Sequence, residues 1–147
     1  MPATVQALIF DVFGTLVDWH GSISREVHTV LGPQRVADPA AFATAWRAQY
    51  QPAMQAVRSG ALPFCKLDVL HRHNLDQVLR DHHLEAVDEA TRVQLNLAWH
   101  RLDAWPDVAP ALRRLRERFR IAPCSNGNIS LMVDLARRNG LPWDAIL

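Results

Sequence analysis

The stretch Leu8–Val17 constrains the fold of this 147-residue chain more than any other part of the sequence. An apolar run leads there into a single carboxylate, Asp11, and then into a turn that contains Gly14 and Thr15. Such runs are typical of buried strands, and a glycine directly after one favours a turn. Ligands of open α/β sheets bind at the carboxyl ends of the strands. The sequence therefore predicts a strand over residues 5–10 that brings Asp11 to the position of a reacting group.

Residues 17–102 have helical periodicity, which separates them from the segments on either side. Asp38 before Pro39 is typical of a helix start. Pro52 is expected to kink or end that helix, because it lacks the backbone N–H and clashes with the preceding turn. A further helix is expected over residues 66–82. These residues are therefore predicted to form a purely helical domain.

The remainder of the chain alternates helix and strand again. Helices are expected over residues 107–118 and 129–139, with a short strand over residues 119–124 between them. Residues 142–147 resemble the approach to a third strand, and Pro123 is unusual in a strand because it cannot donate to a sheet ladder.

This order of elements predicts an α/β fold with a doubly wound, Rossmann-like parallel sheet that is incomplete and carries an inserted α-helical cap domain. The core domain would comprise residues 1–16 and 103–147, and the cap domain residues 17–102. Two strands and the start of a third make a poor sheet, so we expect the chain to be the front part of a longer protein.

Composition argues against several classes of function. The formal net charge is +1, so nothing indicates a nucleic acid or an anionic membrane as partner. No apolar run is long enough to span a bilayer and the N-terminus lacks a secretory layout, so we expect a cytoplasmic protein. The spacing of the cysteines and histidines does not indicate a metal site. Free thiols are expected at Cys65 and Cys124, the latter in the core, and solvated or partly packed rings at His71, His73, His82 and His83.

Three short motifs resemble the haloacid dehalogenase superfamily. Residues Asp11–Thr15 resemble its first motif, D-x-(D/Y/F)-G-T, whose first Asp is a covalent nucleophile. The Ser125–Gly127 loop resembles its second motif, in which a Ser or Thr binds an anion, and Asn126 is similar to an Asn that handles halide in L-2-haloacid dehalogenases. Arg47 follows Trp46 in a pair similar to one whose Arg draws off the halide in those enzymes.

Phe13 favours cleavage of a carbon–halogen bond. In phosphatases of this superfamily a second Asp stands at this position and protonates the leaving alkoxide, and such acid–base help is typically worth about 10²–10⁴ in rate. A phenyl ring cannot supply a proton, and a halide leaving group needs none. L-2-haloacid dehalogenases likewise have an aromatic residue at this position.

The resemblance implies a hydrolase that converts short 2-haloacids, such as L-2-haloacids or haloacetates, to 2-hydroxy acids through an ester on Asp11. No metal or other cofactor is implied, and the expected partners are the haloacid, the halide product and, in a homodimer, a second copy. Donors from the loops and the Arg47 cation would keep Asp11 ionised. The implied catalytic residues are Asp11, Arg47, Ser125 and Asn126, and the implied substrate contacts are Val12, Phe13, Thr15, Trp19 and Ser125.

Alternatives stay open at this point. One is a magnesium-dependent phosphatase or phosphonatase of the same superfamily; for the phosphonatase, Lys66, the only lysine, would form a Schiff base. Another is a non-catalytic, truncated remnant whose sheet edge serves association. The family's catalytic Lys lies on later strands, beyond Leu147, so a polypeptide that ended there is expected to lack dehalogenase activity.

Overall fold

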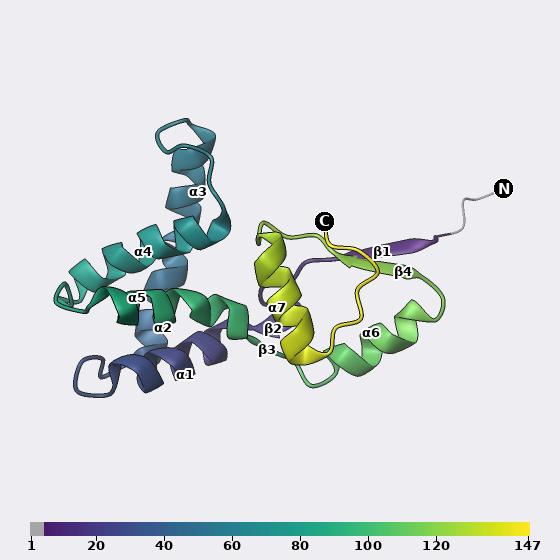
Figure 1. The fold of residues 1–147 in the computed structure, drawn as a ribbon, viewed down its shortest axis with the longest axis horizontal. Helices are drawn as coiled ribbons and strands as arrows, with labels where there is room; N and C mark the ends of the chain where they lie inside the picture. The colour runs from purple at the N-terminus through teal and green to yellow at the C-terminus, as the bar shows by residue number, and fades with distance from the viewer. Residues whose placement is uncertain (1–4) are drawn as a thin grey trace. The chain divides into compact units, whose positions relative to one another are not determined.

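The computed structural model describes residues 5–147, which divide into two compact units (Figure 1). The first unit contains the described residues up to Trp19 together with His100–Leu147, and the second contains His20–Trp99. The sequence placed the domain boundaries after residues 16 and 102, and residues 1–4 of the predicted core domain lie outside the described part of the chain. The assignment of the two units as core and cap domains stays a prediction.

The first unit is built on a parallel pair of strands, β1 (Ala7–Phe10) and β4 (Arg120–Pro123). Two helices flank β4 in the sequence, α6 (Val108–Arg116) and α7 (Ile129–Asn139). Both helices are amphipathic, and their buried side chains form the core of this unit with Ile121 of β4. The buried helical residues are Val108, Leu112, Leu131, Met132 and Leu135.

Strand β1 is not the buried strand that its apolar sequence predicts. Leu8 and Phe10 are half-buried, whereas Ile9 points to the opposite face and is 62% exposed. Successive side chains of a strand point to opposite faces, so a strand with only one covered face leaves every second apolar residue in solvent. The apolar run in the sequence therefore indicated a strand correctly but not its burial.

Pro123 fits the second strand because of the register of the sheet. The backbone N–H groups of Arg120 and Cys124 donate to Gln6 and Phe10 on the β1 side. Ile121 and Pro123 alternate with these residues and face the other edge, where the Ile121 N–H donates to the Asp144 carboxylate at 3.0 Å. The missing N–H of Pro123 thus falls on the edge away from β1 and costs no bond of the parallel ladder.

The expected third strand is only partly formed. Asp144 donates its backbone N–H to the Ile121 carbonyl at 2.9 Å, and Leu147 donates to Pro123 at 3.2 Å. Residues 142–147 therefore follow the second edge of β4 without becoming a regular strand.

A short antiparallel pair, which the sequence did not predict, completes the first unit. Strand β2 (Val17–Asp18) pairs with β3 (Asp103–Ala104). Asn139 at the end of α7 holds β3 in place: its Oδ1 accepts the Ala104 N–H at 2.8 Å, and its Nδ2 donates to the Leu102 carbonyl at 2.9 Å. Gly140, with φ of 64°, then ends α7 in the left-handed conformation, which favours glycine.

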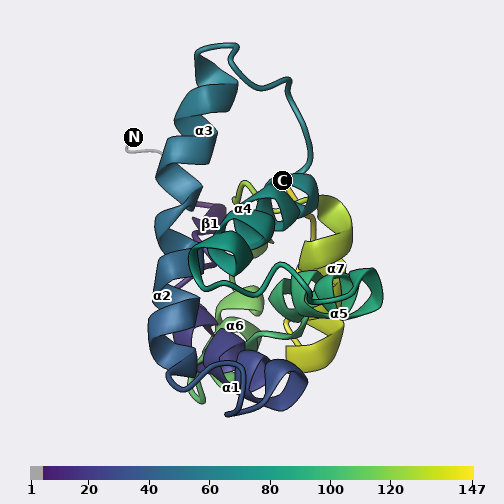
Figure 2. The same ribbon diagram turned by 90° about the vertical axis from the view of Figure 1, so that its left-hand side faces the viewer.

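The second unit is helical. Helices α2 (Pro39–Ala48) and α3 (Tyr50–Arg58) follow one another end to end, with α4 (Leu67–Asp81) beside them (Figure 2). Its elements are α1 (Trp19–Leu31), whose first residue belongs to the first unit, α2 (Pro39–Ala48), α3 (Tyr50–Arg58), α4 (Leu67–Asp81), α5 (Glu89–Asn96) and the 3₁₀ helix η1 (Leu97–Arg101), which ends in the first unit. No helix within residues 5–147 is long and apolar enough to cross a membrane.

Helix boundaries in this unit follow the predicted local signals. The Asp38 carboxylate accepts the Ala41 N–H at 2.9 Å, and Pro39 occupies the first turn of α2. The helical path breaks at Gln49, and Pro52 lies in the first turn of α3. A proline is tolerated there because the N–H groups of a first turn have no partner within the helix.

The core of the second unit is organised around two tryptophans. Trp46 and Trp99 make an edge-to-face contact with ring centroids 5.5 Å apart, and the Trp46 indole donates to the His71 carbonyl at 3.0 Å. The His71 ring stacks on Trp99 at 4.3 Å and is buried. The expectation of a solvated or partly packed His71 is therefore wrong, because an aromatic surface of the core covers one face of its ring.

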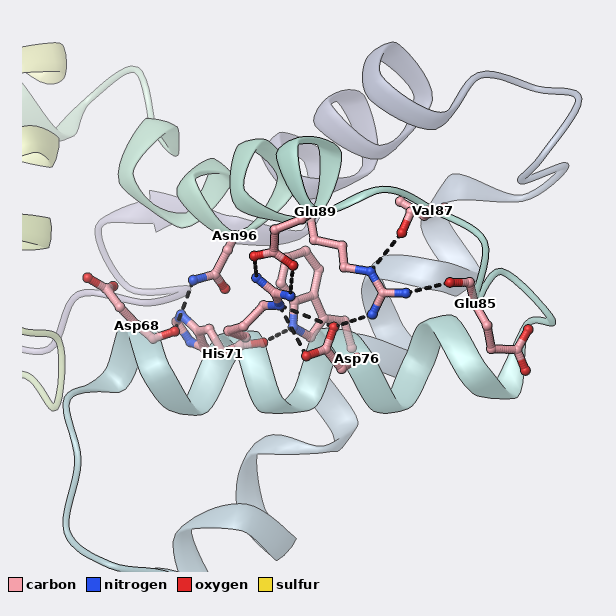
Figure 3. A network of polar contacts seen from close by, with 10 residues as sticks. Asp68, His71, Asp76, Glu85, Val87, Glu89 and Asn96 are labelled. Atoms are coloured by element: carbon pink, nitrogen blue, oxygen red, sulfur yellow. Dashed lines mark hydrogen bonds and ion pairs between the residues drawn. The ribbon is translucent and has the colours of Figure 1, made fainter.

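A network of charged side chains joins α4 to α5 (Figure 3). Arg72 donates to both oxygens of Asp76, at 3.1 Å, and forms a two-point contact with Glu89. Arg92 donates to Asp76 at 2.7 Å and to the Val87 and Glu85 carbonyls. Glu89 raises the pKa of Arg72, and Arg72 in turn lowers the pKa of Glu89, so this pair is charged at neutral pH.

Replacing Asp76 is expected to destabilise the protein because its carboxylate is shared by two arginines. We expect Asp76→Asn to lower the free energy of unfolding by about 1–2 kcal/mol, measured by urea denaturation. The matched control is Asp81→Asn on the same helix, where the exposed carboxylate accepts from Gln77 and from no other residue within 5–147. Equal losses in the two variants would contradict a special role for the network.

The Asp144 carboxylate is expected to make stability depend on pH. The Ile121 N–H, helped by Arg116, holds the pKa of Asp144 below its ordinary value. A carboxyl group with a lowered folded-state pKa contributes stability above its unfolded pKa of about 4 and loses it as the pH falls through the folded value. Asp144→Asn should therefore lower the urea midpoint at pH 7, and the difference from the parent should shrink below about pH 4. Asp107→Asn, a control at an exposed carboxylate, should leave the urea midpoint at pH 7 nearly unchanged.

Candidate active site

Two loops that carry the predicted site residues begin side by side at the end of the parallel sheet. Phe10 and Pro123 are partners in the register, and the Cys124 N–H donates to the Phe10 carbonyl at 2.8 Å. Because the strands are parallel, the chain leaves both in the same direction. Asp11 and Ser125 thus belong to neighbouring loops at the carboxyl ends of β1 and β4.

The first loop presents an ionisable oxygen to solvent. Thr15 Oγ1 donates to Asp11 Oδ2 at 2.6 Å, and within residues 5–147 the other oxygen, Oδ1, accepts no hydrogen bond. Asp11 is exposed, and of the loop donors that the sequence analysis expects around it, Thr15 is the one that bonds it within residues 5–147. Water hydrates an exposed carboxylate, so it needs few donors from the protein. An ionised oxygen without a bonded partner is suited to nucleophilic attack.

Tight backbone turns hold this loop. Gly14 has φ of +89°, and its N–H donates to the Val17 carbonyl at 3.0 Å, while Leu16 donates to Val12 at 2.9 Å. A positive φ favours glycine, which explains why a glycine stands between Phe13 and Thr15. The Val12 side chain is buried, so only its backbone is available to a substrate.

The second loop precedes α7. The Gly127 N–H donates to Ser125 Oγ at 3.2 Å, which turns the chain sharply before the helix begins at Ile129. Ser125 is half-buried and Asn126 is exposed. The N–H groups of a first helical turn carry partial positive charge, so this end of α7 favours an anion.

Aromatic rings lie against both loops. A Cβ built on Gly127 would be 3.6 Å from the Phe13 ring, and one built on Gly14 would be 3.6 Å from the Trp19 indole nitrogen. Phe13 therefore lies beside Gly127 of the Ser125 loop, and Trp19 lies beside Gly14 of the Asp11 loop.

Arg47 belongs to the second unit, on α2. Its guanidinium lies over the Tyr50 ring, 4.3 Å from the ring centroid, in a cation–π contact. The predicted role of Arg47 in the site stays a prediction. Lys66 precedes α4 in the same unit and is exposed.

Two features near the loops differ from the sequence analysis. Cys124 is an exposed free thiol, so the expectation of a core thiol is wrong: it follows the last residue of β4, where the strand leaves the core. Trp105 was not among the predicted site residues, although it donates two hydrogen bonds to the Asp11 loop, at the Gly14 and Leu16 carbonyls. No signal in the sequence connects residues so far apart.

No group of three or more His, Cys, Asp or Glu within residues 5–147 is placed to hold a metal ion.

An α/β unit with an Asp loop and a Ser loop at adjacent strand ends, in a chain with an inserted helical unit, defines a class of hydrolase. The chain belongs to the family of haloacid dehalogenase-like hydrolases, whose model matches residues 5–146. This membership confirms the predicted superfamily and the predicted α/β fold class.

Three relatives are dehalogenases by name. (S)-2-haloacid dehalogenase 4A of Burkholderia cepacia is 29% identical over 133 residues, which are 90% of this chain and 54% of that protein. The solved structure of a defluorinating L-2-haloacid dehalogenase is 44% identical, with a TM-score of 0.92 over 97% of this chain and 60% of that one. A second L-2-haloacid dehalogenase is 40% identical, with a TM-score of 0.89 over 98% of this chain and 62% of that one. The chain therefore spans only a little over half the length of these relatives.

Proposed function

We propose that the protein to which this chain belongs hydrolyses the carbon–halogen bond of short 2-haloacids and yields 2-hydroxy acids. The observation that carries this proposal is the Asp11 carboxylate, which is exposed and bonded to Thr15 through Oδ2 only. Phe13 stands where a phosphatase would need a second acid, and the relatives are named as haloacid dehalogenases.

The bonding of Asp11 indicates which oxygen reacts. Thr15 occupies Oδ2, so Oδ1 attacks C2 of the haloacid in line with the carbon–halogen bond, and the halide leaves with the bonding electron pair. This step forms an ester and inverts C2. Water then attacks the Asp11 carbonyl carbon, which releases the 2-hydroxy acid, regenerates the carboxylate and frees one proton.

Other groups of the site bind charge. Ser125 Oγ and the amides at the start of α7 would hold the substrate carboxylate, because that end of a helix favours anions. Arg47 and Asn126 would receive the departing halide, and a guanidinium there would stabilise the charge that develops in the transition state. Val12 through its backbone, Phe13, Thr15 and Trp19 would line the substrate. The reaction as written uses no metal or other cofactor, and a cytoplasmic homodimer remains part of the proposal.

The experiment uses protein made from the native gene. We expect chloride release from L-2-chloropropionate in the presence of EDTA, measured with a halide electrode. Asp11→Asn should abolish this release, because an amide oxygen is a poor nucleophile, whereas the exposed control Asp107→Asn should keep it. Magnesium-dependent phosphate release without any halide release would overturn the proposal in favour of a phosphatase.

An isotope experiment tests the ester itself. In a single turnover in H₂¹⁸O with enzyme in excess, the product should carry ¹⁶O from Asp11, and the label should appear in the enzyme carboxylate. Direct attack by water on C2 would put ¹⁸O in the product instead, which would contradict the covalent step while leaving the overall reaction intact.

A further inference from the structure

We propose that Trp105 is a positioning residue for the nucleophile, acting through Gly14 and Thr15. The effect of Trp105 on catalysis rests on the proposed function, whereas its effect on the order of the loop does not. Trp105 directly follows β3, yet it contacts a loop that is about ninety positions earlier in the sequence. It does not touch the Asp11 carboxylate, so its effect is transmitted by the loop.

Trp105 binds the loop on both sides of Thr15. Its indole Nε1–H donates to the Gly14 carbonyl at 3.1 Å, and its backbone N–H donates to the Leu16 carbonyl at 3.0 Å. The Gly14 carbonyl belongs to the peptide group whose nitrogen is that of Thr15. Thr15 Oγ1 in turn donates to Asp11 Oδ2 at 2.6 Å. The Trp105 indole is therefore linked to the Asp11 carboxylate in three steps: a hydrogen bond to the Gly14 carbonyl, the covalent path through Thr15, and the hydrogen bond from the Thr15 hydroxyl.

The loop needs such a restraint because it contains a glycine in an unusual conformation. Gly14, with φ of +89°, gives the backbone more freedom than any other residue would, and the hydrogen bonds within the turn use the Gly14 N–H but not its carbonyl, which accepts from Trp105. A hydrogen bond to its carbonyl removes that freedom. The Trp19 indole lies on the side where a Cβ of Gly14 would be, with its nitrogen 3.6 Å from that position.

Trp105 is itself anchored. Its neighbour Ala104 pairs with Val17 and donates its N–H to Asn139 Oδ1 at 2.8 Å. The Trp105 carbonyl accepts the Val108 N–H at 3.1 Å, which ties it to the start of α6. The side chain is nevertheless 41% exposed, so burial of the ring does not account for a tryptophan at this position, whereas its N–H donor does.

The substitution that isolates the donor is Trp105→Phe, which keeps an aromatic ring and removes the N–H. Without the bond, Thr15 holds Asp11 Oδ2 for a smaller fraction of the time, and Oδ1 is aligned with C2 less often. In the full-length protein we expect kcat for L-2-chloropropionate to fall about three- to tenfold, with KM changed less than twofold. The matched control is Trp143→Phe in the same unit, whose indole has no hydrogen bond within residues 5–147; it should leave kcat unchanged.

Coupling to Thr15 separates positioning from a general structural role. In a Thr15→Val background the hydroxyl is absent, so Trp105→Phe should lower kcat no further. An equal fold-loss in both backgrounds would overturn the inference, because it would mean that the tryptophan acts independently of Thr15.

NMR gives a readout that does not need turnover. The Trp105 indole N–H should exchange slowly with solvent for so exposed a side chain, and Trp105→Phe should shift the amide signals of Asp11 and Thr15. Unmoved signals together with a rapidly exchanging indole would overturn the inference. If the parent protein releases no halide, the proposed function fails, while these NMR results still decide whether Trp105 orders the loop.

Discussion

The parallel pairing of β1 with β4 is the constraint on which the candidate site depends. Its register sets Phe10 beside Pro123, and the Cys124 N–H closes the ladder on the Phe10 carbonyl. A shift by one residue would turn the side chains at the strand ends to the opposite face and separate the Asp11 loop from the Ser125 loop. The position of Phe13 beside Gly127 is consistent with the same register.

The two units differ in how many hydrogen-bond donors surround a carboxylate of each. In the helical unit Asp76 is shared by Arg72 and Arg92, so its oxygens are occupied and its negative charge is balanced locally. In the first unit Asp11 has one donor on one oxygen and leaves the other without a hydrogen-bond partner within residues 5–147. A balanced carboxylate stabilises a structure, whereas an unbalanced and accessible one is available for chemistry. This contrast supports Asp11 as the reacting group.

Local signals in the sequence predicted much of the secondary structure correctly. Asp38 begins α2 by accepting the backbone N–H of Ala41, three residues later, and α7 has the bounds that its pattern predicts. Burial was predicted less well, as Ile9 and Cys124 show. Apolar character indicates what a side chain prefers, but its exposure depends on which other elements cover that face.

The sequence by itself determined the chemistry available to this protein: an Asp with Gly and Thr after a strand, an aromatic residue in place of a second acid, and a Ser–Asn–Gly turn before a helix. These are properties of neighbouring residues, so a short motif is enough to reveal them. Only the tertiary structure decided that Trp105 holds the Asp11 loop, that Asn139 anchors β3 and that Pro123 loses no ladder bond. Each of these depends on hydrogen bonds between segments far apart in the chain, whose partners are fixed by packing and leave no local pattern in the sequence.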